Sequence, residues 1–258
     1  MRVTFVGVGE AFDECLPNTS LFVAGMTGES RRTVLLDCGF TAAAAFFGCP
    51  SLSDADRRDG PDAVWLSHFH GDHYFGLPYL LARMQEQGRA QPLCIHGGEG
   101  VANRVWQVVE LAYPNLRDRL DFEVVCLEAR PDAPLVIAGF SARAAVTGHG
   151  ALCLGLRLET QFGILYYGGD GAPTPACREL ASGCALVVQE GYGMLPGMAG
   201  HGSVAEAVEM AEAAWANTLA VVHVRRELRR ERGAEIARQL AAASIRALLP
   251  EPGEVFEA

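Results

Sequence analysis

Three histidines and one aspartate fall within six residues of this chain. They are His68, His70, Asp72 and His73. Imidazole nitrogen and carboxylate oxygen are donors that bind zinc and similar divalent metals. In an extended stretch, residues two apart point the same way, so His68 and His70 can bind one ion together, and Asp72 and His73 can face a second one. We favour this prediction over a polar surface turn, because histidine is the commonest metal ligand.

Further donors follow at the ends of later apolar segments. His149, His201 and His223 lie near strand ends or in glycine-flanked loops, and Asp170 ends the run from Ile164. A lone histidine in an apolar setting is more often a hydrogen-bonded core residue, but the first cluster requires partners. Strand ends can converge at one edge of a sheet.

A dinuclear site would then assemble from seven residues. We expect the first ion to bind His68, His70 and His149, the second to bind Asp72, His73 and His223, and Asp170 to bridge the two. A carboxylate suits the bridging position because it has two oxygens. His96 has no place in this scheme, and we leave it without a role.

Short apolar runs alternate with helical patterns, which predicts an α/β layered fold. The predicted strands are Arg2–Gly7, Ser20–Ala24, Thr33–Asp37, Ala63–Ser67, Leu93–His96, Phe122–Cys126, Ser141–Thr147, Leu152–Glu159, Phe162–Tyr167, Leu186–Gln189 and Leu219–His223. The predicted helices are Thr41–Phe47, Tyr74–Gln87, Gly98–Ala112, Ser203–Trp215 and Arg226–Ala242. Ser203 followed by Glu206 fits a capping box. The polar stretch Ser51–Pro61 is predicted to be a surface loop.

Length and composition favour one intracellular domain. No linker divides the 258 residues, so we predict a single domain over residues 1–258. No segment is long and apolar enough to span a bilayer, and the start lacks the pattern of a signal peptide. The eight cysteines are scattered without a C-x-x-C pair, which is typical of reduced thiols in a cytoplasmic protein.

The net charge of −10 disfavours long nucleic acids as partners, although a metal site can still attract a nucleotide-like substrate. The one dense basic stretch, Arg225–Arg232, is interpreted as a solvated helix face. The loop before His201 contains Tyr192, Met194, Leu195, Pro196 and Met198. It could form an apolar substrate wall or a dimer contact, and the sequence leaves both open.

These residues resemble the metallo-β-lactamase fold superfamily. Its signature H-x-H-x-D-H is matched in full by the first cluster, and its later ligands are matched in order by His149, Asp170 and His223. Asp37, after Leu35-Leu36, matches an early aspartate that supports the histidine loop rather than binding metal. The resemblance covers essentially the whole chain. It implies an αββα sandwich, in which two β-sheets pack face to face with helices outside.

A narrower resemblance is to ribonuclease Z and related phosphodiesterases. The start Phe5–Ala11, the segment Pro17–Ser20 and the stretch His149–Glu159 are similar to that group. Glu190 and His201 match a family pair in which the Glu orients a catalytic His, although Gln189 replaces the family's His before that Glu. The spacing between His149 and Asp170 leaves no room for the family's insertion that grips transfer RNA. A compact phosphodiesterase or another small-substrate hydrolase therefore fits better.

The resemblance implies a hydrolase with two divalent ions, zinc in the first place and manganese or iron as alternatives. Asp72 would orient the attacking hydroxide, and His201, held by Glu190, would donate a proton to the leaving oxygen. Three other interpretations stay open at this point. They are a thioester or lactone hydrolase, an iron-dependent sulfur dioxygenase-like enzyme, and a non-enzymatic binding module. Related enzymes often form homodimers, but the sequence does not decide the oligomeric state.

Overall fold

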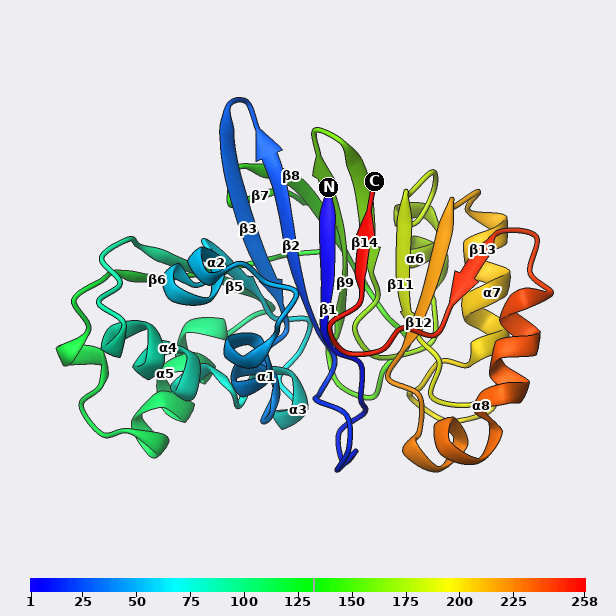
Figure 1. Ribbon diagram of the computed structural model, residues 1–258, viewed down its shortest axis with the longest axis horizontal. Coiled ribbons are helices and arrows are strands. Elements are labelled where there is room, and N and C mark those ends of the chain that lie inside the picture. The colour runs from blue at the N-terminus through cyan, green and yellow to red at the C-terminus, as the bar shows by residue number, and fades with distance from the viewer. Residues whose placement is uncertain (132) are drawn as a thin grey trace.

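The computed structural model describes residues 1–131 and 133–258. In this part of the chain two seven-stranded sheets pack against each other (Figure 1). The first has the order β14-β1-β2-β3-β4-β5-β6 and the second has the order β13-β12-β11-β10-β9-β8-β7. The strands of the first sheet are β14 (Val255–Glu257), β1 (Arg2–Gly7), β2 (Ser20–Thr27), β3 (Ser30–Leu36), β4 (Ala63–Trp65), β5 (Leu93–Gly97) and β6 (Val124–Glu128). Those of the second are β13 (Arg246–Leu248), β12 (Thr218–Val222), β11 (Leu186–Glu190), β10 (Gly163–Tyr167), β9 (Leu154–Thr160), β8 (Phe140–Val146) and β7 (Pro134–Ile137).

Consecutive apolar residues in the strands explain why both faces of each sheet are covered. Val3 and Phe5 of β1 enter the central core between the sheets, whereas Val6 packs on the opposite face. In β11, Leu186 and Val188 enter the same central core and Val187 points outward. Successive residues of a strand point to opposite faces, so a strand that is apolar throughout must be buried on both sides.

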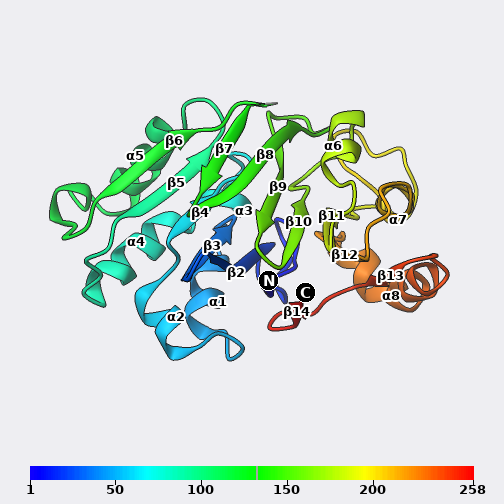
Figure 2. The same cartoon turned by 90° about the horizontal axis from the view of Figure 1, so that it is seen from above.

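Helices cover the outer face of each sheet (Figures 1 and 2). The first sheet is covered by helices from the first half of the chain: α1 (Ala42–Gly48), α2 (Asp54–Asp59), α3 (Gly71–Tyr74), α4 (Leu77–Glu86) and α5 (Val101–Ala112), followed by the 3-10 turn η1 (Arg117–Arg119). The second sheet is covered by α6 (Pro175–Leu180), α7 (Val204–Ala213) and α8 (Arg226–Ala241). This arrangement confirms the predicted αββα sandwich.

Most predicted elements are present, with three differences. The predicted loop Ser51–Pro61 contains α2, because the Ser53 side chain accepts a hydrogen bond from Asp56 N and caps a six-residue helix. The predicted helix Tyr74–Gln87 corresponds to α4, which begins only at Leu77, and its predicted first residue is the last residue of the separate short helix α3. The sequence analysis also missed α6 and the short strands β7, β13 and β14. The N-cap half of the capping box predicted at Ser203 is present, since Ser203 Oγ accepts from Glu206 N at 3.2 Å. The Glu206 carboxylate accepts from Ser203 Oγ at 2.6 Å rather than from the backbone N–H of Ser203 that the box requires.

The order and direction of the strands bring the donor residues to one edge. Strands β10, β11 and β12 run parallel, so their carboxyl ends meet. Strand β4 runs parallel to β3 and β5 in the first sheet. Asp170, Glu190 and His223 lie at or just after the ends of β10, β11 and β12, respectively, and the histidine cluster follows β4. The candidate site therefore takes side chains from both sheets.

Two further features concern the cysteines and the helices. All eight cysteines are free thiols, and five of them are buried. Within residues 1–131 and 133–258, no helix has the length and apolar character that crossing a membrane requires.

Candidate metal centre

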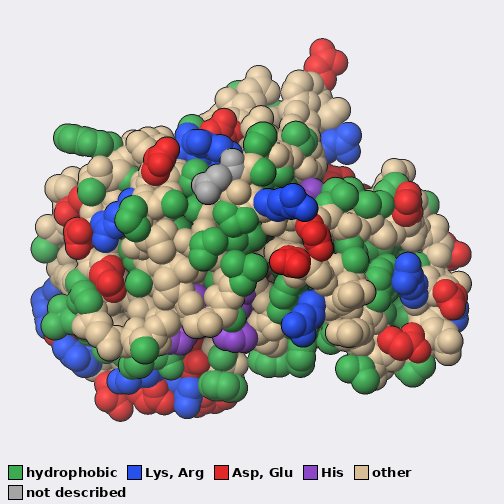
Figure 3. Space-filling view, turned by 180° about the vertical axis from the view of Figure 1, so that it is seen from behind, with side chains coloured by type: hydrophobic (Ala, Val, Ile, Leu, Met, Phe, Trp, Pro, Cys, Tyr) green, Lys and Arg blue, Asp and Glu red, His purple; other side chains and the backbone are tan. Residues whose placement is uncertain are grey.

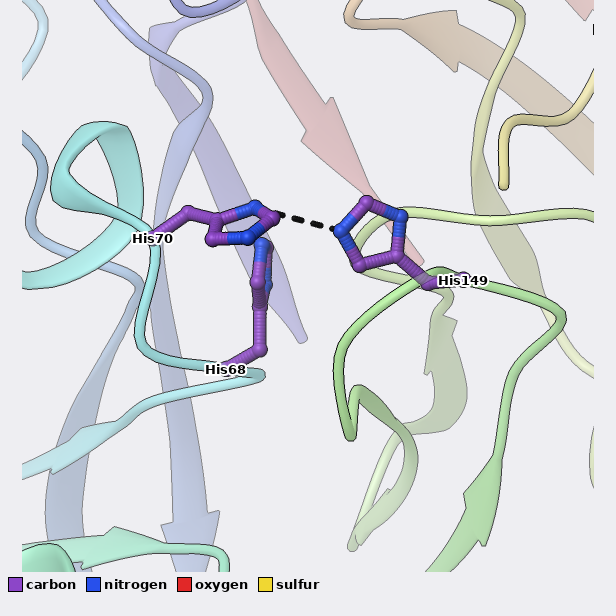
Figure 4. Close-up of side chains that lie close together, drawn as sticks. All are labelled: His68, His70 and His149. Carbon is purple, nitrogen blue, oxygen red and sulfur yellow. Dashed lines mark hydrogen bonds between the residues drawn. The ribbon is translucent and has the colours of Figure 1, made fainter. Parts of the chain in front are cut away.

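Three histidines converge to form the first donor group. His68 and His70 come from the loop between β4 and α3, and His149 comes from the loop between β8 and β9. Figure 4 shows the three rings turned toward one another, with His70 Nδ1 and His149 Nε2 3.2 Å apart. His149 Nδ1 lies 2.6 Å from the Gly200 carbonyl, which can only accept a hydrogen bond. That nitrogen therefore carries the hydrogen, and the lone pair of His149 Nε2 faces the centre.

Two carboxylates and two histidines form the second donor group. Asp72, His73, Asp170 and His223 are all buried, and their donor atoms lie within 4.8 Å of one another. His73 Nε2 is 3.0 Å from Asp72 Oδ2 and 3.3 Å from Asp170 Oδ1. Asp170 Oδ2 lies 3.9 Å from His68 Nε2 in the first group. Asp170 therefore stands between the two groups, where the sequence analysis placed the bridging ligand.

The unsatisfied atoms of this cluster have the chemistry of metal donors. His68 Nε2, His73 Nε2 and Asp170 Oδ1 are buried and have no hydrogen-bond partner among the residues that the structure describes. A buried polar atom without a partner costs folding free energy, so such atoms indicate that an ion or another ligand binds there. Nitrogen and carboxylate oxygen donors in this mixture suit zinc or manganese. The residues present thus fit a pair of divalent ions.

Charge within the cluster points to the same conclusion. Burial, together with nearby His73, lowers the pKa of His68 to about 2, so its ring is neutral and can donate a lone pair. Burial alone would also lower the pKa of His73, but Asp170 and Asp37 outweigh it and raise that pKa. Burial would raise the pKa of Asp72, but His73 and His223 hold it below its usual range. A divalent cation can replace the proton that these carboxylates attract to His73.

Asp37 organises both donor groups without facing the centre itself. Its carboxylate accepts hydrogen bonds from Ser67 N and Ser67 Oγ, both at 2.7 Å, and from Tyr167 Oη at 2.6 Å. The same carboxylate lies 2.8 Å from His73 Nδ1, which leaves Nε2 of that ring free for metal. Ser67 Oγ also contacts His68 Nδ1 at 3.0 Å. Asp37 therefore fixes the orientation of one histidine directly and of another through Ser67.

We expect Asp37→Asn to lower zinc affinity about 10-fold to 100-fold, the usual effect of losing an outer-shell partner. An amide offers one acceptor oxygen where the carboxylate offers two. Asparagine also tolerates the left-handed backbone of Asp37, which has φ 58°. Competition with a chromophoric chelator measures the affinity. Asp62→Asn is the matched control, because Asp62 precedes β4 and accepts from Thr33 N at 2.8 Å, away from the cluster. Equal affinities in the wild type and both variants would contradict this role.

His201 and Glu190 form a pair beside the metal donors. Glu190 is the buried last residue of β11, and its Oε1 lies 2.6 Å from His201 Nδ1. Its other oxygen accepts from Gly202 N at 2.9 Å and from Gly171 N at 2.5 Å. The hydrogen bond to Glu190 raises the pKa of His201, although burial opposes this. The Tyr192 ring stacks on the His201 ring, with centroids 4.4 Å apart and planes 21° apart.

Comparison with known proteins places these residues in a family. Residues 32–224 match the model described as the beta-lactamase superfamily domain, and this stretch contains the residues of both donor groups. The chain belongs to the beta-lactamase superfamily. A ribonuclease Z from Methanosarcina acetivorans is 30% identical over 162 residues, which are 61% of this chain and 48% of that protein. The zinc phosphodiesterase ELAC protein 1 of Bos taurus is 31% identical over 121 residues, which are 45% of this chain and 31% of that protein.

The chain therefore aligns with half or less of the length of these two relatives. A solved structure shows the same fold over nearly its whole length. The metallo-beta-lactamase fold protein YhfI from Bacillus subtilis superposes with a TM-score of 0.77 and 23% identity, covering 99% of each chain. This likeness confirms the fold that the H-x-H-x-D-H signature implied.

Within this superfamily member, the interval between His149 and Asp170 is filled by a hairpin. Strands β9 and β10 pair antiparallel, with only two residues between them. No additional arm emerges at this position, as the spacing in the sequence predicted. Gln189 stands where the ribonuclease Z group has a histidine, according to the resemblance noted in the sequence. It is buried and donates to the Gly171 carbonyl at 3.0 Å. Gln189 and Glu190 thus fix the residue that follows Asp170.

The donors open into a cavity of about 380 Å³. Five residues of the two donor groups line it, namely His70, Asp72, His149, Asp170 and His223. His201 and Tyr192 line it as well. Figure 3 shows histidine side chains reaching the surface close together on one face of the molecule. Residues that the sequence did not identify include Ser67 and Tyr167. Tyr192 lines the cavity, which agrees with the substrate wall that the sequence left open as one of two roles for its loop. A tyrosine in an apolar strand has the pattern of a core residue, so only its position opposite Asp37 reveals what it does.

Proposed function

We propose that this chain is a dinuclear metal-dependent hydrolase that cleaves a small or nucleotide-like phosphodiester. The observation that supports it most directly is the convergence of seven residues with metal-donor side chains beside an open cavity. Several of their donor atoms are buried without a hydrogen-bond partner among the described residues. The named activities of the ribonuclease Z and zinc phosphodiesterase relatives support the choice of a phosphodiester. Zinc is the first candidate metal, and manganese or iron are the alternatives.

The proposed metal ligands are those expected from the sequence. His68, His70 and His149 would hold one ion, Asp72, His73 and His223 the other, and Asp170 would contact both. When bound, a pair of divalent ions activates water at neutral pH and neutralises charge on substrate oxygens. The protein must then orient the water and supply a proton to the leaving group.

Two side chains have positions suited to those tasks. Asp72 lines the cavity, and its carboxylate can accept a hydrogen bond from the attacking water. His201 lines the same cavity, and its Nδ1 is held by Glu190, so its Nε2 is the nitrogen left to donate a proton to the leaving oxygen. Glu190 positions His201 without facing substrate.

The cavity favours a small substrate over a long nucleic acid. Its volume of about 380 Å³ is suited to a ligand of small-molecule size. The hairpin between His149 and Asp170 provides no arm for gripping a folded RNA, and the net charge of −10 does not attract a polyanion. We further propose a single domain over residues 1–258 that works in the cytoplasm, where its eight thiols stay reduced. A homodimer stays a prediction.

Turnover of bis(p-nitrophenyl) phosphate tests the proposed function. We expect chelator-treated protein to lose this activity, and added Zn²⁺ or Mn²⁺ to restore it at about two ions per chain. Metal at a thousandfold excess over its dissociation constant should also stabilise the fold by about 4 kcal/mol, which raises Tm by roughly 8–16 °C. Restored metal with no phosphodiester turnover, but with turnover of thioesters or lactones, would favour an acyl hydrolase. Coloured protein that binds mainly iron would favour dioxygenase chemistry.

A further inference from the structure

The loop between β1 and β2 carries an exposed aromatic residue into the metal-site cavity. Phe12 is 73% exposed, and it lines the same cavity as Asp170, His201 and His223. Exposing a phenyl ring to water carries no benefit for folding, because the ring is stabilised only when it is removed from water. A ring in this position is suited to contact a substrate.

A buried carboxylate holds the backbone of Phe12. Glu10 is only 1% exposed, and its Oε2 accepts a hydrogen bond from Phe12 N at 2.9 Å. Its Oε1 accepts from Arg226 Nη1 at 2.6 Å. Both oxygens of the buried charge are thus used, one by the loop and one by α8. Arg226 lies three residues after the metal donor His223, whose N donates to the Val8 carbonyl at 3.0 Å.

A second ion pair joins the same helix to the same loop. Arg230 lies 2.7 Å from Glu14 Oε1 and 3.6 Å from Asp13 Oδ1. Asp13 Oδ1 also accepts from Cys15 N at 2.9 Å, which closes the turn. The arginine-rich start of α8 is therefore more than the solvated helix face that its sequence predicted. Two of its arginines hold the loop that presents Phe12.

A second aromatic residue lines the cavity from another element. Phe40, between β3 and α1, is 50% exposed and also lines the cavity. Its ring packs edge-on against Phe75, with centroids 5.7 Å apart and planes at 87°. Gly71 permits this position, because a Cβ there would lie 2.5 Å from the Phe40 ring. The cavity thus combines metal donors with two supported aromatic rings.

We propose that Phe12 is a specificity-determining residue that stacks on a planar aromatic group of the substrate, such as the base of a nucleotide, and that Glu10 and Arg226 position it. This inference rests on the proposed function, since it names the group that the hydrolysed ester carries. Stacking suits this contact because every base has a π-face, and one aromatic side chain can change binding of a base by roughly 5-fold to 100-fold.

Binding of two phosphate monoesters to the zinc-loaded protein tests the stacking. Adenosine 5′-monophosphate and ribose 5-phosphate carry the same phosphate and differ in the base. We expect calorimetry to show tighter binding of the nucleotide to the wild type, and Phe12→Ala to remove roughly 5-fold to 100-fold of that preference. Phe12→Trp should keep it. Phe162→Ala is the matched control, because Phe162 is 56% exposed in the turn between β9 and β10 and does not line this cavity.

The positioning role is tested by the arginine that reaches Glu10. Arg226→Gln should lower the preference for the nucleotide in the direction of Phe12→Ala, with metal content unchanged, and Arg226→Lys should recover part of it. Arg232→Gln is the control on the same helix, since Arg232 pairs with Glu235 on the exposed surface. A full preference in Arg226→Gln would overturn the positioning role.

The inference and the proposed function fail in different ways. Equal affinity of the wild type for both monoesters, including no measurable binding of either, overturns the aromatic contact. An unchanged preference in Phe12→Ala overturns it as well. A clear preference that depends on Phe12, in a zinc-loaded protein that cleaves no phosphodiester, supports the inference and overturns the proposed hydrolase alone.

Discussion

Asp170→Ala is expected to abolish phosphodiester hydrolysis, with a loss of roughly 10³-fold or more. Asp170 lies between the two donor groups, 3.3 Å from His73 Nε2 and 3.9 Å from His68 Nε2. Under the proposed assignment, its removal would take away a ligand shared by both ions and the negative charge that offsets their repulsion. Metal ions contribute several kcal/mol of charge stabilisation, and each 1.4 kcal/mol is about tenfold in rate. Elemental analysis should find fewer than two ions per chain.

Two companion variants separate metal loss from unfolding. Asp170→Asn keeps the shape of the side chain and should still lose metal, while its circular dichroism stays that of the wild type. Asp54→Ala removes a carboxylate whose side chain is 95% exposed in α2, and it should keep both metal and activity. If Asp170→Ala retains two ions per chain and normal turnover, the bridging role is wrong.

The second large effect is expected from His201→Ala. General acid catalysis contributes about 10²-fold to 10⁴-fold, and we expect a loss in that range for a substrate with an alkoxide leaving group, such as a dinucleotide. Bis(p-nitrophenyl) phosphate should lose less, because nitrophenolate leaves without needing a full proton. Steady-state rates on the two substrates measure the difference. The metal content should stay at two ions per chain.

Metal content in His201→Ala also distinguishes two roles for this residue. His149, Asp170 and His201 can themselves be grouped as donors to one ion, because their atoms lie within 4.8 Å of one another. If His201→Ala loses an ion, His201 is a ligand rather than a proton donor. An equal loss on both substrates with metal retained would instead indicate a structural role. Only a loss that depends on the leaving group agrees with general acid catalysis.

The convergence of the candidate donors could be predicted from the sequence, because metal binding demands rare residue types at short spacing. The H-x-H-x-D-H run marks four candidate donors directly, and it strengthens the same interpretation of later single residues such as His149 and His223. The layered fold was also predictable, because strands such as β4, Ala63–Trp65, are apolar at every position and must be buried on both faces. Family resemblance then supplied the order in which the elements stack.

The supporting residues could not be predicted in the same way. Tyr167 reaches Asp37 across 130 residues of sequence, and nothing in its apolar strand marks it as different from the buried Tyr166. The helix α2 was missed because five of its six residues are charged, and its start depends on one serine side chain. The pairing of Arg226 with Glu10 joins residues 216 positions apart, so an arginine run alone cannot show which of its members faces an acid.

Because the candidate donors come from both sheets, metal binding should affect how long the protein survives proteolysis in the cell. The cluster after β4 belongs to one half of the sandwich, whereas His149, Asp170 and His223 belong to the other. Bound ions would act as a cross-link between the halves, and their loss would leave buried carboxylates facing one another. We therefore expect metal starvation to shorten the protein's half-life through proteolysis, so that zinc supply sets its abundance as well as its activity.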